Sequence, residues 1–99
     1  MAGYRLLSEA RRELEAAVSF YDSIYPALGR DFAVEVQAIC QRIAESPQAG
    51  LEVRPEIRRR ILRRFPYVVL YAVEDDEVVV VAVAHQKRRP GYWAGREDI

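Results

Sequence analysis

The spacing of the apolar residues changes once along this chain, and the change divides it into a helical part and a strand part. Up to Ser46, apolar residues recur every three or four positions, which is the period of one helix face. From Ile57 onward they stand in short continuous runs rich in valine and tyrosine, which favour buried strands. A chain of 99 residues has room for one domain. The pattern therefore predicts a single α+β domain over residues 1–99.

Two amphipathic helices are expected in the first half, over residues 8–25 and 30–46. The pair Tyr25-Pro26 ends the first helix, because the residue before a proline is disfavoured in the helical region. The connecting loop is so short that the helices must lie antiparallel, as a helical hairpin. Cys40 lies on the apolar stripe of the second helix and is expected to be a small buried hydrophobe.

The second half is expected to form a small twisted antiparallel sheet, with the helical hairpin packed on one face. Strands are predicted at residues 4–7, 57–65, 67–73 and 78–85, followed by a C-terminal segment at residues 90–97. The last two strands are apolar at successive positions, so both faces of the sheet should be covered. The helical hairpin can cover only one of them. We therefore expect the C-terminal segment or a partner chain to cover the other.

Positive charge is concentrated in two places, although the net charge is zero. The segment from Gly50 to Arg64 carries six arginines against two glutamates, and residues 85–99 carry four cations against two carboxylates. A local basic surface of this kind can bind polyanions without a high overall charge. The longest apolar run, residues 65–73, is too short to cross a bilayer, and the charged N-terminus is unlike a secretion signal. A cytoplasmic protein with no membrane partner is expected.

The arginine-rich stretch is the first candidate for a binding surface. Alternate side chains of an extended chain face opposite ways, so Arg58, Arg60 and Arg64 are expected to share one face. Their spacing of roughly 6.6–6.8 Å is close to the repeat of a nucleic-acid backbone, and guanidinium groups match phosphate or carboxylate geometry. The alternative is a solvated edge strand, whose charges only discourage aggregation between sheets.

A cluster of basic and aromatic residues follows the last expected strand. Its members are His85, Lys87, Arg88, Arg89, Tyr92, Trp93 and Arg96. Such a set could bind phosphates and stack on bases, and His85 could move a proton near neutral pH. Equally, His85 could be a hydrogen-bonded structural residue, and Trp93 could anchor the tail on the open sheet face. No glycine-rich phosphate loop and no metal-ligand spacing occurs, so neither a metal nor a small-molecule cofactor is expected.

These features occur in the same order in a known family. The most specific are a Phe-Pro-Tyr run near the middle and a final His, Arg-x-Pro-x-x-Trp series. The positions that carry the pattern are Ala10, Leu14, Tyr21, Phe32, Val36, Ile43, Pro47, Gly50, Arg58, Phe65, Pro66, Tyr67, Tyr71, His85, Arg88, Pro90, Trp93 and Arg96. The chain thereby resembles the ParE/RelE toxins of bacterial type II toxin–antitoxin systems, and is closer to the ParE branch. The resemblance implies a cognate antitoxin that wraps and neutralises the toxin.

The resemblance leaves three functions open. A ParE-like toxin would bind DNA gyrase, through a target surface comprising Arg58, Arg60, Arg64, Lys87, Arg88, Arg89, Tyr92, Trp93 and Arg96. A RelE-like toxin would cleave messenger RNA on the ribosome without a metal, with catalytic candidates Arg60, Arg63, His85, Lys87, Arg88 and Tyr92. RelE-like enzymes carry lysines before the arginine strand, whereas residues 48–57 contain none. The third possibility is an inactive relative that only binds its antitoxin. Gyrase binding is the leading expectation, and it requires the arginine stretch and the C-terminal cluster to converge.

Overall fold

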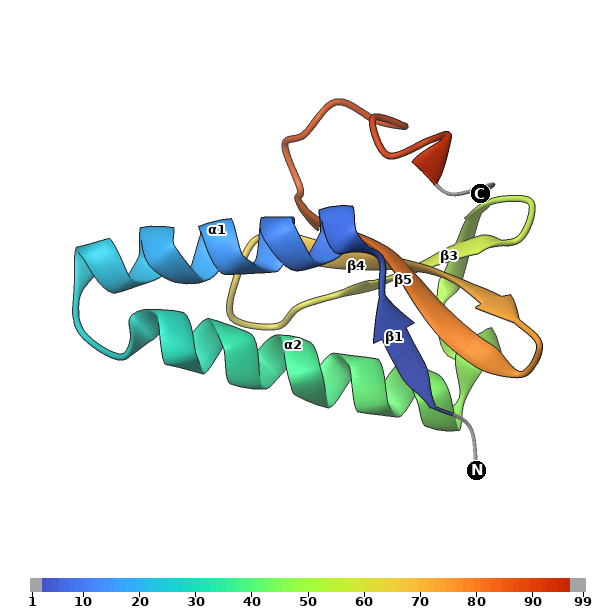
Figure 1. The fold of residues 1–99 in the computed structure, drawn as a ribbon, viewed down its shortest axis with the longest axis horizontal. Helices are drawn as coiled ribbons and strands as arrows, with labels where there is room; N and C mark the ends of the chain where they lie inside the picture. Colours follow the sequence, from blue (N-terminus) through green and yellow to red (C-terminus); the bar gives the residue numbers. More distant parts are fainter. Residues whose placement is uncertain (1–2, 97–99) are drawn as a thin grey trace.

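The computed structural model describes residues 3–96 as two helices packed on a five-stranded sheet (Figure 1). The elements are β1 (Tyr4–Leu6), α1 (Ser8–Ile24), α2 (Leu28–Glu45), a short helical turn (Pro47–Ala49), β2 (Leu51–Arg54), β3 (Ile57–Ile61), β4 (Tyr67–Glu74) and β5 (Glu77–His85). The strand order in the sheet is β1-β5-β4-β3-β2. This is the expected α+β class, with a helical hairpin ahead of the sheet. No helix of residues 3–96 is long and apolar enough to cross a membrane.

A close approach between the two helices sets the geometry of the helical hairpin. The backbone N–H of Gly29 donates a 2.8 Å hydrogen bond to the Asp22 carboxylate, and a Cβ at Gly29 would collide with the carbonyl of Val18. Ala27 takes a left-handed conformation, with φ 72°, and so turns the chain sharply. The second helix therefore begins at Leu28, two residues before its expected start.

The sheet is mixed, which corrects the expectation of a purely antiparallel sheet. The short N-terminal strand β1 pairs with β5 in parallel, and the other three pairings are antiparallel. The chain crosses from β1 at one edge of the sheet to β2 at the opposite edge through α1 and α2, and β3, β4 and β5 then follow in order back to β1. Leu7 continues the pairing of β1 with β5 by donating to the carbonyl of Val80 at 3.0 Å. β1 is one residue shorter than the predicted strand at residues 4–7.

Two features of the arginine-rich region also differ from expectation. β3 ends at Ile61, four residues earlier than predicted, because Glu35 of α2 accepts hydrogen bonds from the backbone N–H groups of Arg63 and Arg64 and draws the chain away from the sheet. β2, in contrast, is not among the strands that the sequence predicts. All four of its residues are exposed, so the strand carries no alternating burial pattern that would indicate it.

Both faces of the β4–β5 hairpin are buried, as its continuous apolar sequence predicts. One face, including Val69 and Tyr71, packs against the helices. The other face, including Val68 and Leu70, packs against Trp93, which is only 6% exposed. The segment that carries Trp93, residues 86–96, is called the tail below, and it turns back past the start of α1 (Figure 1). The tail thus covers the second face, while residue 97 of the predicted segment lies outside the described residues.

Candidate functional site

A single carboxylate holds the tail in place. Glu13 of α1 accepts hydrogen bonds from the Tyr92 hydroxyl at 2.6 Å, from the two terminal nitrogens of Arg96 at 3.1 and 2.9 Å, and from the Val83 N–H at 3.0 Å. Arg96 also donates to the carbonyl of Val81 at 2.9 Å. The N–H of Val83 and the carbonyl of Val81 lie on the edge of β5, past the residues that pair with β1. The side chains of Glu13 and Arg96 satisfy these two groups in place of a neighbouring strand. We call this set of contacts the Glu13 clasp.

The clasp fixes the protonation states of its members. Burial opposes ionisation of Glu13, but hydrogen bonds from Arg96, Tyr92 and Val83 outweigh it and hold the pKa of Glu13 below its usual value. Burial and the bond to Glu13 raise the pKa of Tyr92 far above its usual value. The Tyr92 hydroxyl is therefore a neutral donor at physiological pH, already committed to a partner.

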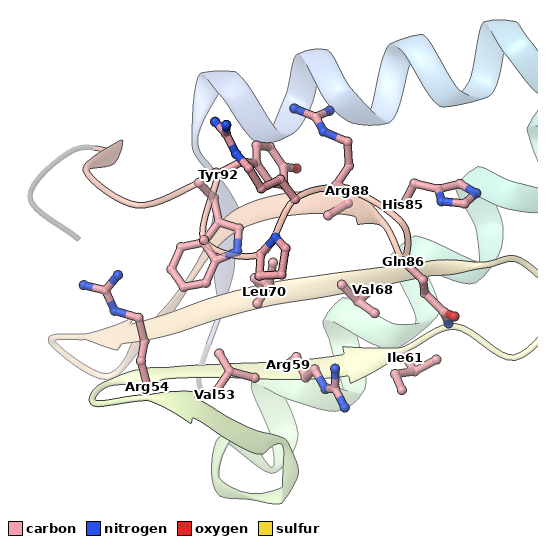
Figure 2. A pocket seen from close by; sticks show the side chains of 15 residues that line it. Val53, Arg54, Arg59, Ile61, Val68, Leu70, His85, Gln86, Arg88 and Tyr92 are labelled. Atoms are coloured by element: carbon pink, nitrogen blue, oxygen red, sulfur yellow. The ribbon is translucent and has the colours of Figure 1, made fainter.

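Guanidinium groups cover the aromatic rings of the tail. The guanidinium group of Arg88 lies 3.9 Å from the centroid of the Tyr92 ring, and that of Arg96 lies 5.1 Å from it. On the other side of the tail, Arg54 of β2 lies 5.4 Å from the Trp93 ring. The contact between Arg54 and Trp93 connects the tail to the edge strand β2, whereas the Glu13 clasp connects the tail to α1. Figure 2 shows Arg88 directed toward α1.

A cleft of about 590 Å³ lies between the tail and the outer strands of the sheet (Figure 2). Its floor is apolar, with Val68 and Leu70 from β4, and Ile61 of β3 lies at its rim. Its polar lining consists of Arg54, Arg59, His85, Gln86, Arg88 and Arg89. Among residues 3–96, no carboxylate lines the cleft and none of its four arginines has an ion-pair partner. We call this strongly basic feature the sheet cleft.

The arginine stretch does not form the single row that strand alternation predicted. Arg58 and Arg60 lie opposite Tyr71 and Val69, on the face that packs against the helices, whereas Arg59 lies opposite Leu70, on the tail side. Only Arg59 of the stretch therefore reaches the sheet cleft.

Two of the arginines expected on the target surface have partners within the protein, although Arg64 remains exposed. Arg58 donates to the Gly50 carbonyl at 2.7 Å and to the Gln48 side chain at 3.0 Å. Arg64 lies beyond the end of β3 and pairs with Asp31 at 3.6 Å. The expected convergence of Arg58, Arg60 and Arg64 with the C-terminal cluster is thus wrong, because the first two face the helices and the third lies outside the strand.

The candidates for messenger-RNA cleavage are divided between two sides of the sheet. Arg60 faces the helices, and Arg63 lines a separate groove along α2. The imidazole of His85 accepts a 3.0 Å hydrogen bond from the backbone N–H of Lys87 and lies edge-on to Tyr67, with 5.2 Å between centroids. His85 therefore has structural contacts of the kind that the alternative interpretation expected.

Sequence reasoning missed two residues of the sheet cleft, Arg54 and Arg59. Arg59 shares one face of β3 with Ile57 and Ile61, which is the face that the tail covers. Arg54 belongs to the strand that no burial pattern indicated. Alternation within β3 places Arg59 on the same face as Ile57. It would therefore have located Arg59 beside the tail once the tail was known to cover that face.

The described residues offer little other chemistry. Among residues 3–96, no group of three histidine, cysteine or acidic side chains could hold a metal ion. Cys40 is 1% exposed, and burial raises the pKa of its thiol to about 12. It is a buried hydrophobe, as predicted, and not a nucleophile at neutral pH.

Comparisons with known proteins agree with this fold. A family model described as "ParE toxin of type II toxin-antitoxin system, parDE" matches residues 4–90. Toxin ParE2 of Mycobacterium tuberculosis strain CDC 1551 / Oshkosh is 30% identical over 79 residues, or 79% of this chain and 75% of that protein, and the same toxin of strain H37Rv matches equally. A solved structure described as "Chromosomal ParDE TA system from P. aeruginosa" superposes with a TM-score of 0.74 at 16% identity, over 86% of this chain and 95% of that chain.

Proposed function

This chain belongs to the ParE toxin family of type II toxin–antitoxin systems, and we propose on that basis that it arrests bacterial growth by binding and inhibiting DNA gyrase in the cytoplasm. A toxin of such a system has an antitoxin as its partner. The target surface that we propose is the sheet cleft together with the exposed part of the tail.

One observation carries the proposal. Arg54, Arg59 and Arg89 surround an apolar floor, and no carboxylate of residues 3–96 neutralises them. The apolar rim is open as well, because Ile61 is 48% exposed and Val53 is 40% exposed. Apolar area supplies affinity at an interface, and unpaired guanidinium groups supply strong, charge-assisted hydrogen bonds to an acidic target. The cleft therefore suits binding to a macromolecule.

Cleavage of messenger RNA has less support. Proton transfer in catalysis requires acid and base groups within hydrogen-bond reach of one reacting phosphate. Arg60 and Arg63 lie away from the tail, and the Tyr92 hydroxyl is bound to Glu13. Of the remaining candidates, His85 and Arg88 line the sheet cleft together but Lys87 does not, and the separation of these residues from Arg60 and Arg63 supports an inhibitor rather than a ribonuclease.

A supercoiling assay with purified gyrase and relaxed plasmid tests the proposal. Wild-type toxin at micromolar concentration is expected to inhibit supercoiling. The double variant Arg59→Gln/Arg89→Gln is expected to need about a hundredfold more protein or greater, because each lost charged hydrogen bond is worth roughly 1.5–3 kcal/mol. Arg42→Gln, which removes the same charge from the α2 groove, is the matched control and should inhibit like the wild type. Unchanged supercoiling with folded wild-type toxin would refute gyrase inhibition.

A further inference from the structure

The outer side of β1 is an open edge of the sheet (Figure 1). Among the strands of residues 3–96, β1 pairs only with β5. The Leu7 N–H bonds to β5, and alternate residues of a parallel strand use the same neighbour, so Arg5 also directs its backbone groups toward β5. The N–H and C=O groups of Tyr4 and Leu6 therefore point outward, where no partner within residues 3–96 binds them. An edge of this kind can accept a further strand.

A groove of about 490 Å³ lies beside this edge, between β1 and the two helices. Its apolar lining includes Leu14 of α1 and Val36 of α2, together with Tyr4 and Leu6. The last two side chains pack against the helix-side core but are only half-buried. A strand added at the edge would place side chains over this groove, because neighbouring strands share the two faces of a sheet. The edge thus offers apolar surface as well as backbone hydrogen bonds.

The charge on β1 is neutralised within its own chain. Charged side chains on an edge strand normally discourage the joining of two sheets, and like charges directly opposite each other are destabilising. Arg5, the only charged residue of β1, lies on the face away from the helices and pairs with Glu74 at 3.6 Å and with Glu77 at 3.4 Å. Two copies of this arginine side by side would lie among four carboxylates, two from each copy. Arg5 therefore does not block the edge.

The strand is complementary to itself. When two copies of β1 run antiparallel about a central Arg5, Tyr4 of each copy lies opposite Leu6 of the other. The outward N–H and C=O groups of both residues then all have partners, and both helical hairpins lie on the same side of the sheet. We propose that two copies of this chain associate edge to edge through β1, which joins their five-stranded sheets into one continuous sheet. This inference goes beyond the proposed function and does not depend on it.

Amide hydrogen exchange of the full chain, followed by NMR at low and high protein concentration, tests this interface. Sedimentation equilibrium on the same samples measures the dissociation constant of the dimer. In the dimer, the amides of Tyr4 and Leu6 are expected to exchange at least about tenfold more slowly than in the dilute monomer, because each gains a hydrogen bond. The amides of Arg5 and Leu7 are the internal control and should not change, because they bond to β5 in either state.

Two substitutions at one position separate the outward hydrogen bond from the side chain. Leu6→Pro and Leu6→Ala both shorten the apolar side chain, but only the proline removes the outward N–H. An edge strand tolerates proline where its N–H faces away from the sheet. The dissociation constant of the Leu6→Pro dimer is expected to exceed that of the Leu6→Ala dimer by about tenfold or more, because the dimer loses one hydrogen bond from each copy. Thermal unfolding verifies that both variants are folded.

Three results would overturn the proposal. The first is a monomer at every concentration in the sedimentation experiment. The second is a dimer in which the amides of Tyr4 and Leu6 exchange as fast as in the monomer, because its interface would then lie elsewhere. The third is an equal dissociation constant for the two Leu6 variants. None of these samples contains gyrase, so the dimer can be established or refuted whatever the outcome of the supercoiling assay.

Discussion

The Glu13 carboxylate accepts a 2.6 Å hydrogen bond from the hydroxyl of Tyr92, 79 residues further along the chain. The same carboxylate pairs with Arg96 at 2.9 Å, and the side chains of this ion pair are only 17% and 15% exposed. One acidic residue of the first helix therefore fixes the tail, which forms one wall of the sheet cleft. The stability of the fold and the shape of the candidate site both depend on it.

Replacement of Glu13 by alanine should destabilise the protein by about 3 kcal/mol, because breaking a buried pair leaves one charge uncompensated. The orphaned charge is the guanidinium of Arg96. Urea unfolding measures the loss. Glu15→Ala, in the same helix but exposed, is the matched control and should change the free energy of unfolding by less than about 0.5 kcal/mol. Equal effects of the two substitutions would show that the clasp contributes nothing.

The stabilisation by Glu13 should disappear in acid. The folded-state pKa of Glu13 lies below its ordinary value of 4.5, so the folded protein binds fewer protons than the unfolded chain between these two pKa values. The contribution is thus complete above pH 4.5 and is lost as the pH falls through the folded-state pKa. The difference in unfolding free energy between wild type and Glu13→Gln, measured by urea titration at several pH values, should shrink on acidification. A difference that stays constant below pH 4.5 would contradict this assignment.

Gly29→Ala should weaken the helical hairpin by about 2 kcal/mol, within the range that overpacking costs. The added Cβ would meet the carbonyl of Val18 and the carboxylate of Asp22, and neither helix can retreat without losing its packing. Thermal unfolding followed by circular dichroism measures the effect. Gly3→Ala serves as the control, because no atom lies within 4 Å of a Cβ at that position. A melting temperature that is the same for both variants would refute the close approach.

Arg58 and Arg59 are neighbours in the sequence, but only Arg58 is expected to contribute to the stability of the fold. Arg58→Ala removes hydrogen bonds to Gly50 and Gln48 and should lower the free energy of unfolding by about 1–2 kcal/mol. Arg59→Ala removes a group that lines the sheet cleft and should leave stability within about 0.5 kcal/mol of the wild type. Urea midpoints of the two variants decide between these roles. A larger loss of stability in Arg59→Ala than in Arg58→Ala would mean that Arg59, and not Arg58, lies on the face of β3 that packs against the helices.

The features that follow from local spacing were predictable. The two helices were recognised from apolar residues three and four positions apart, and the β4–β5 hairpin from two continuous apolar runs around an acidic turn. The same continuity indicated that a second layer must cover the sheet, and anchoring of the tail was one of the two roles expected for Trp93. In each case the signal is carried by side chains within a few residues of one another.

The features that were missed depend on residues far apart. β2 is exposed throughout and exists because it pairs with β3, while Tyr71 anchors the turn before it. β3 ends at Ile61 because Glu35, on a different element, binds the next backbone groups. Strand alternation was correct for Arg58 and Arg60 but could not say which face the helices would cover.

Periodicity along the chain therefore sufficed for the α+β class, the helical hairpin and the concentration of arginines in two regions, because side-chain direction repeats with the local backbone geometry. The sheet cleft arose only from tertiary structure. It needed a carboxylate from α1 to hold Tyr92 and Arg96, and it needed the face of β3 that carries Arg59 to turn toward the tail. Contacts between residues so distant in sequence leave no repeating pattern, since each is made by elements that meet only once the chain has folded.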